Sequence, residues 1–257
     1  MPGVDEVASS PERTAAATPA SCALGLRIAH IAVTVEGLSD ELRQGLADLL
    51  RPFVVDVPDA TAAVRLEVRR PPRHSGWVIA QNGEVRRSVQ DVEKLLTYLE
   101  WCAAATALEA TAAHAVFHMA ALTRGGATVL LVADSGAGKT TLTTSLIQRG
   151  WQPFGDDITL VNPATQAVQT FPRCFHVDAF TESSIVMPAL FERSRSLAGY
   201  IRPLSWAESG SRPTCIMQLT RDAQAAATAY PLTQAEAAGA LLAASLGRGI
   251  SKPEVVR

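Results

Sequence analysis

Lys139 lies in the stretch of this chain whose residue types are best suited to chemistry. Residues 129–142 read VLLVADSGAGKTTL, in which an apolar run ends in a loop of small residues and a helical pattern follows. A glycine-rich loop between a strand and a helix turns backbone N–H groups inward and can hold the phosphates of a nucleotide. Gly136 and Gly138 allow the tight, partly left-handed backbone that such a loop needs. We therefore predict a P-loop, with Lys139 reaching the β- and γ-phosphates and the Thr140 hydroxyl holding Mg²⁺.

The loop departs from the usual pattern at its first position. The motif normally opens with glycine, and Ala133 stands there instead. Alanine is the smallest alternative, so we count the departure as a weak defect. The competing interpretation is a glycine-rich turn with no ligand. The strand pattern before the loop, the helix pattern after it and the intact SGAGKT core argue against that interpretation.

Two adjacent acidic residues follow at a spacing that can return them to the loop. Asp156 and Asp157 come seventeen and eighteen residues after Lys139, a separation that one helix and one short strand would fill. One carboxylate could coordinate Mg²⁺, and the other could accept a proton from an attacking hydroxyl. Taken alone, Gly-Asp-Asp is better explained as a polar turn before a strand. The predicted P-loop upstream reverses that preference.

Two other side chains are weaker candidates. His118 precedes Lys139 by 21 residues, on a strand predicted over 115–122 that would pair with the P-loop strand. It could donate a hydrogen bond or move a proton near the γ-phosphate, but a half-buried histidine without a chemical role is an equally good interpretation. His114 takes its place if the register differs. Arg173 could stabilise charge on a transferred phosphoryl group, although a surface arginine is the simpler interpretation.

Length and composition indicate a globular protein with ample core. The chain has 257 residues, of which 47% are hydrophobic and 19% charged, enough for one large domain or two small ones. A formal net charge of −2 gives no electrostatic reason to expect nucleic acid or an anionic membrane as partner. The four cysteines are scattered without a CxxC pair, which favours reduced thiols in a cytoplasmic protein and no structural zinc. The most apolar long window, 101–122, contains three ionisable side chains and is not predicted to span a membrane.

The remaining patterns divide the chain into three parts. Residues 1–24 are predicted to be a disordered tail. Residues 25–110 are predicted to form a small α+β module, and residues 111–257 a domain around the P-loop. The elements expected in the module are a strand at 26–35, a helix at 39–50 capped by Ser39, strands at 64–68 and 77–80, a turn at Asn82-Gly83, and a helix from Ser88 to about 110.

The elements expected in the P-loop domain are mostly short strands. A hairpin turn is predicted at 124–126 and a helix from Lys139 to Gln148. The strands expected after that helix are 158–161, 168–171, 175–177, 214–219 and 226–230. Thr233 and Glu236 are predicted to form a capping box that opens a last helix ending near Gly247. Residues 181–212 give no clear pattern.

Four features occur in the same order as in a known family: His118, SGAGKT at 135–140, Arg149-Gly150 and Asp156-Asp157. Together they resemble the kinase core of HPr kinase/phosphorylase, and more closely the HPr-kinase-like, or HprK-related, proteins. The resemblance covers residues 114–180 well, reaches 247 more loosely, and does not cover 1–110. It implies an α/β P-loop kinase domain with mixed sheets, of the phosphoenolpyruvate-carboxykinase-like kind, and not a RecA-type parallel sheet.

The resemblance also implies roles for individual residues. ATP would be bound by one run of the chain: Ser135, Gly136, Ala137, Gly138, Lys139, Thr140 and Thr141. Mg²⁺ would be held by Thr140 with help from Asp157, and Asp156 would be the base that takes a proton from a serine-type hydroxyl. His118 would lie near the transferred phosphate. The acceptor implied is a hydroxyl of a peptide, protein or small molecule, such as free serine or the terminal serine of a ribosomally made precursor peptide.

Several alternatives stay open at this point. The glycine-rich signature that follows the core in true HPr kinases is missing, which argues against HPr itself as the acceptor. That absence and Ala133 also leave room for an ATP-binding sensor or scaffold that transfers no phosphate. An ATPase coupled to a partner and a small-molecule kinase of the shikimate type fit the pattern less well. The sequence does not decide the acceptor or the oligomeric state, a homo-oligomer included.

Overall fold

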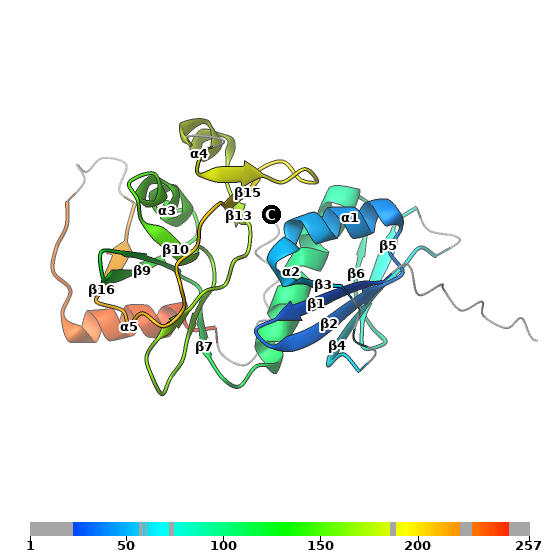
Figure 1. The fold of residues 1–257 in the computed structure, drawn as a ribbon, viewed down its shortest axis with the longest axis horizontal. Coiled ribbons are helices and arrows are strands. Elements are labelled where there is room, and N and C mark those ends of the chain that lie inside the picture. The colour runs from blue at the N-terminus through cyan, green and yellow to red at the C-terminus, as the bar shows by residue number, and fades with distance from the viewer. Residues whose placement is uncertain are drawn as a thin grey trace, which may run out of the picture.

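The computed structural model describes residues 23–56, 59, 61–71, 75–185, 189–221 and 228–246. In these residues the chain is mixed α/β, with more strands than helices, and its strands form several sheets (Figure 1). Almost all of the tail predicted at 1–24 lies outside the described residues. Among the helices that the structure describes, none combines the length and the apolar character needed to cross a membrane.

The first half of the described chain is a six-stranded mixed sheet with two helices, on the right of Figure 1. Its strands are β1 (Leu24–Ile28), β2 (Ile31–Glu36), β3 (Val54–Val55), β4 (Val64–Arg69), β5 (Trp77–Gln81) and β6 (Glu84–Val89), in the order β3-β1-β2-β4-β5-β6. Helix α1 (Asp40–Leu49) leads into a short 3₁₀ turn, η2 (Arg51–Phe53), and α2 (Val92–Ala110) follows β6. Helix α2 packs on the sheet, and α1 packs on α2.

The single strand predicted over 26–35 is wrong. The segment is the hairpin of β1 and β2, joined at Ala29 and His30, whose φ angles are 47° and 71°. Two consecutive residues with positive φ make a tight turn that suits the twist of a hairpin. Neither residue is a usual turn former, so the strand-like alternation of the sequence runs through the turn without a visible break. The hairpin turn predicted at Asn82-Gly83 is confirmed, between β5 and β6.

Helix starts in this half agree with the sequence at one position and differ at the other. Ser39 caps α1, and its hydroxyl accepts a hydrogen bond from the backbone N–H of Leu42 at 3.3 Å. Ser88, the cap predicted for the second helix, lies instead in β6. The N-cap of α2 is Asp91, whose carboxylate accepts from the N–H of Lys94 at 2.9 Å. Asp91, three residues after Ser88, offers the same capping chemistry, so the helix can begin later and β6 can include Ser88.

The second half is built on a four-stranded sheet in the order β10-β8-β9-β16. Its strands are β8 (Ala120–Arg124), β9 (Ala127–Ala133), β10 (Gln152–Gly155) and β16 (Cys215–Leu219). The turn predicted at 124–126 is confirmed, since β8 and β9 form an antiparallel hairpin. Strand β16 pairs parallel to β9. The helices of this half are α3 (Lys139–Ile147), α4 (Ala179–Ser184) and α5 (Gln234–Ala244), the last opened by the predicted capping box.

Two three-stranded sheets complete the second half. One has the order β12-β11-β7, formed by β12 (Val168–Gln169), β11 (Thr159–Val161) and β7 (Ala115–Phe117). The other has the order β13-β15-β14, formed by β13 (Phe175–His176), β15 (Tyr200–Pro203) and β14 (Phe191–Arg193). The strand predicted over 115–122 is therefore two strands, with a break after β7. The strand predicted at 226–230 begins outside the described residues, and 228–230 are not strand. The last helix, predicted to end near Gly247, ends at Ala244.

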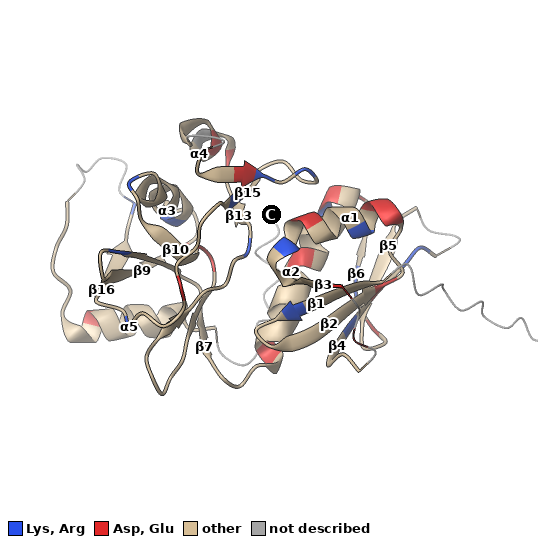
Figure 2. Ribbon diagram, in the orientation of Figure 1, with Lys and Arg blue, Asp and Glu red and all other residues tan. Residues whose placement is uncertain are grey.

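The two halves share their largest hydrophobic cluster. Most of its members come from the six-stranded sheet, α1 and α2, but Ile158, Leu160 and Phe171 join it from the second half. The rings of Phe53 and Phe171 lie 5.2 Å apart, centre to centre. Charged residues of both signs are scattered over both halves (Figure 2). The two halves are thus fixed against each other by apolar packing.

Candidate active site

The glycine loop, residues 134–138, joins the end of β9 to the start of α3. Gly136 and Gly138 have φ angles of 78° and 98°, and Gly138 is the N-cap of α3. A side chain at either glycine would meet open space, so the backbone conformation, not crowding, requires glycine there. Ala133 is the last residue of β9, where extended backbone needs no glycine. The N-terminus of α3 directs its partial positive charge into this loop.

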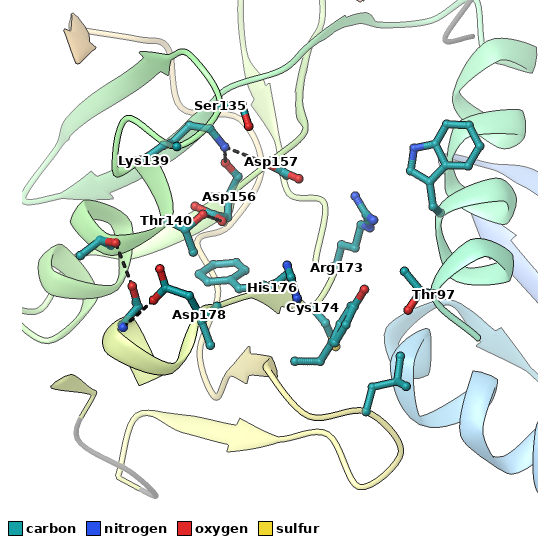
Figure 3. Close-up of a pocket in the computed structure, with 18 of the residues that line it drawn as sticks. Thr97, Ser135, Lys139, Thr140, Asp156, Asp157, Arg173, Cys174, His176 and Asp178 are labelled. Atoms are coloured by element: carbon teal, nitrogen blue, oxygen red, sulfur yellow. Dashed lines mark hydrogen bonds and ion pairs between the residues drawn. The ribbon is translucent and has the colours of Figure 1, made fainter. Parts of the chain in front are cut away.

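Lys139 and the two acidic residues meet next to this loop (Figure 3). The Lys139 ammonium donates to the Asp156 carbonyl oxygen at 2.8 Å and to Asp157 Oδ1 at 2.7 Å. The sheet explains the meeting: β10 pairs with β8 beside β9, and the doublet follows β10 directly. Gly155 makes the turn possible, because a Cβ there would collide with the Ile158 carbonyl. Burial lowers the pKa of Lys139, but the charges of Asp156 and Asp157 outweigh it and the net pKa is raised.

The two carboxylates have different surroundings. Asp156 is 5% exposed and accepts a hydrogen bond from the Thr140 hydroxyl at 2.7 Å, while its buried Oδ1 has no hydrogen-bond partner. Burial raises the pKa of Asp156, although Lys139 opposes the rise. The Asp157 side chain is 40% exposed. Burial alone would raise its pKa too, but the nearby charges of Lys139, Arg173 and His118 hold it well below the ordinary value.

The contacts of the doublet can be set beside the roles that the resemblance implied. The resemblance implied that Asp157 shares Mg²⁺ with Thr140 and that Asp156 is the base. In the structure the Thr140 hydroxyl contacts Asp156, and Asp157 is the more exposed carboxylate. Thr141, expected to contact the nucleotide, shares a hydrogen bond of 2.9 Å with the Thr181 hydroxyl of α4.

His118 lies beside the doublet, but not on the strand that the sequence predicted. It falls in the break between β7 and β8, and its backbone N–H donates to the Ala244 carbonyl at the end of α5 at 2.7 Å. Its Nδ1 is 3.9 Å from Asp157 Oδ1, and its side chain is 37% exposed. His114, the alternative, does not line the cleft described below.

Arg173 is not a surface residue. Its Nε and Nη2 contact the two carboxylate oxygens of Glu100 at 2.5 and 2.7 Å, and the Glu100 side chain is 1% exposed. Burial lowers the pKa of Arg173, but the pairing with Glu100 outweighs it and the net pKa is raised. Arg173 thus keeps a fixed positive charge near Asp157. Sequence reasoning missed Glu100, although a single carboxylate within the apolar run LLTYLEWCAAATAL is a usable signal.

These residues line one large cleft between the two halves. It encloses about 1860 Å³, and its walls include the glycine loop, the doublet, His118 and Arg173. Ordinary small-molecule pockets hold about 300–1,000 Å³. The opposite wall, from the end of β6 and from α2, holds residues that the sequence did not predict to be part of a site, and so does the segment with His176 and Asp178. They carry no recognisable motif.

The donor set suits a hard divalent ion that also binds a substrate. Among the described residues, no group of three or more His, Cys, Asp or Glu side chains could hold a metal alone. Mg²⁺ in nucleotide sites is usually bound by one or two protein oxygens together with phosphates and waters. The partnerless Asp156 Oδ1, next to the Thr140 hydroxyl, is a buried oxygen of the kind that such an ion would satisfy. The residues therefore fit Mg²⁺ bound with a nucleotide.

Comparison of the chain with protein-family models and with curated proteins found no match.

Proposed function

We propose that this protein is a Mg·ATP-dependent kinase that transfers the γ-phosphate to a serine-type hydroxyl. The fold proposed for the second half is the P-loop kinase domain of the phosphoenolpyruvate-carboxykinase-like kind. The observation that supports the proposal best is the contact of one ammonium with both members of the acidic doublet, 2.8 and 2.7 Å from Lys139 Nζ. A purely structural glycine turn would not need a buried lysine and two acids at its mouth.

The proposed nucleotide contacts follow from the loop. Backbone N–H groups of residues 134–138 and the N-terminus of α3 would receive the phosphates, and Lys139 would exchange its contact with Asp157 for one with the β- and γ-phosphates. Thr140 and Asp156 would hold Mg²⁺, which would neutralise phosphate charge when bound. This reverses the roles of the two acids that the resemblance implied.

The chemical step would place Asp157 next to the acceptor. The acceptor oxygen forms a bond to the γ-phosphorus while the bond from that phosphorus to the β–γ bridging oxygen breaks, and ADP leaves with the electron pair. Asp157 accepts the proton of the hydroxyl. Arg173, held by Glu100, and His118 lie near enough to Asp157 to influence its charge and could stabilise negative charge on the phosphoryl group.

Two asparagine variants test the assignment. Asp157→Asn should lower transfer to hydroxyl acceptors by about 10²–10⁴-fold and leave ATP binding measurable, because only the base is lost. Asp156→Asn should weaken binding of ATP in the presence of Mg²⁺ more than binding of ATP in its absence. Asp40→Asn is the control, since that carboxylate is 86% exposed on α1. The measurements are ATP titration and ADP release with free serine and serine peptides.

The outcomes separate this function from its main alternative. Transfer by Asp157→Asn at the rate of the unmodified protein would remove the base from the proposal. Tight ATP binding without ADP release on any acceptor would favour the sensor or scaffold instead. A cytoplasmic location stays a prediction. Cys102, Cys174 and Cys215 are free thiols in the part of the chain that the structure describes, as a reducing compartment would keep them.

A further inference from the structure

The wall of the cleft opposite the glycine loop belongs to the first half of the chain. The end of β6 and the first turns of α2 supply Arg87, Ser88, Gln90, Lys94, Thr97 and Trp101. Figure 3 shows Thr97 across the cleft from Lys139 and the doublet, with Arg173 between them. A ligand that touched both walls would therefore lie beside the proposed base.

The cleft has more room than one nucleotide needs. Its volume of about 1860 Å³ exceeds by roughly 860 Å³ the upper end of the usual range for a small-molecule pocket, about 1,000 Å³. The remaining space is itself as large as a whole ligand pocket. A free amino acid would leave most of it to water, whereas several residues of a polypeptide would fill it.

This wall also carries two cations, Arg87 and Lys94, that are not paired with a carboxylate of the described residues. The Arg87 guanidinium lies 5.1 Å from the centre of the Tyr98 ring, a contact that holds it in place. Neither Arg87 nor Lys94 forms an ion pair with another described residue. Glu93 is the single acid among the described residues of this wall. Two cations against one anion favour a ligand that brings its own carboxylates.

The strand that ends in this wall can also bind a polypeptide through its backbone. Strand β6 is the last of the six-stranded sheet and, among the described residues, pairs only with β5. Most of its side chains are exposed, and its last residues, 87–89, line the cleft. The unpaired backbone groups of an edge strand are a standard docking site for an extended peptide.

We propose that the acceptor is an extended polypeptide segment with acidic residues close to its serine, docked on the wall formed by β6 and α2. Arg87 and Lys94 pair with its carboxylates, and the serine hydroxyl reaches Asp157 across the cleft. This inference rests on the kinase function proposed above and names the class of its substrate.

The test measures peptide binding without chemistry. Fluorescein-labelled 15-residue peptides with one central serine and acidic, neutral or basic flanks are titrated with the full chain, and anisotropy is recorded. The acidic peptide should bind most tightly. Arg87→Ala and Lys94→Ala should each weaken it about fivefold, as expected for an ion pair open to solvent. Arg86→Ala is the matched control, because this neighbouring arginine does not line the cleft and pairs with Glu84.

A charge-reversal variant distinguishes a specific loss of peptide binding from a loss caused by misfolding. Lys94→Glu should weaken the acidic peptide and tighten the basic one, a gain that a damaged protein would not show, and ATP binding should be unchanged. Equal binding of acidic and neutral peptides, or equal losses in Arg87→Ala and Arg86→Ala, would overturn the proposal. Phosphorylation of free serine with no peptide binding would overturn the docking wall and leave the kinase. Peptide binding as predicted, with no ADP from any acceptor, would support the wall and overturn the kinase.

Discussion

Glu100→Gln is the substitution whose cost the structure defines best. The Glu100 side chain is 1% exposed, and its two oxygens accept from Nε and Nη2 of Arg173. Removing one partner of a buried ion pair costs about 3–5 kcal/mol, because the other charge stays buried. We expect the lower end, about 3 kcal/mol, since glutamine can still accept one hydrogen bond and Asp157 still attracts Arg173. For a chain of this size that corresponds to a fall in Tm of about 6–12 °C.

Urea unfolding measures this loss of unfolding free energy and calorimetry measures the fall in Tm. Two further variants serve as comparisons. Glu182→Gln is the control, because its partner Arg193 is 58% exposed and the pair should contribute no more than about 1 kcal/mol. The double replacement of Glu100 and Arg173 by leucine should regain most of the stability, since it removes both buried charges. It should still lose phosphoryl transfer. A loss below about 1 kcal/mol in Glu100→Gln, indistinguishable from Glu182→Gln, would refute the reasoning that Arg173 is a buried charge which depends on Glu100.

Two further predictions concern groups outside the proposed chemistry. Burial, partly offset by Arg202, raises the pKa of Cys174 to about 11. Iodoacetamide at pH 8 should therefore label the exposed Cys215 and leave Cys174 unmodified until the protein unfolds. Equal labelling rates of the two thiols in the native protein would contradict this. Burial alone would raise the pKa of Asp48, but hydrogen bonds from Ser194, the Arg195 N–H and Arg51 lower it overall. The stability it contributes is therefore present above about pH 4 and lost as the pH falls further. Asp48→Asn should cost about 1 kcal/mol at pH 7 and little at pH 3 by urea unfolding, whereas equal costs at both would show that the charge is irrelevant.

The parts of the site that the sequence predicted depend on short-range patterns. The strand, the glycine loop and the helix are adjacent in the chain, and the left-handed angles at Gly136 and Gly138 are what only glycine adopts easily. The return of Asp156 needs only one helix and one strand, whose lengths bring it back to Lys139. Local backbone preferences and the spacing along the chain were therefore sufficient to predict that Asp156 lies close to Lys139.

The parts that the sequence missed depend on contacts between distant segments. Glu100 and Arg173 are 73 residues apart, and nothing near either residue predicts the other. His118 was expected on a strand, but pairing of β7 with β11 and of β8 with β9 pulls the chain into two sheets and leaves His118 at the break. The wall of β6 and α2 faces the cleft only because the two halves share a core. No sequence motif predicts that shared core.

The contact between Lys139 and Asp157 gives the proposed kinase an order of events. In the structure the ammonium already has two oxygen partners, so a nucleotide must replace one of them with its own phosphate oxygens. The carbonyl of Asp156 is fixed in the turn after Gly155, whereas the Asp157 carboxylate belongs to a side chain that is 40% exposed and can rotate. The carboxylate is therefore the partner to be released. Binding of ATP would free Asp157 towards the cleft, where the acceptor docks, so the base would become available only after the phosphate donor is in place.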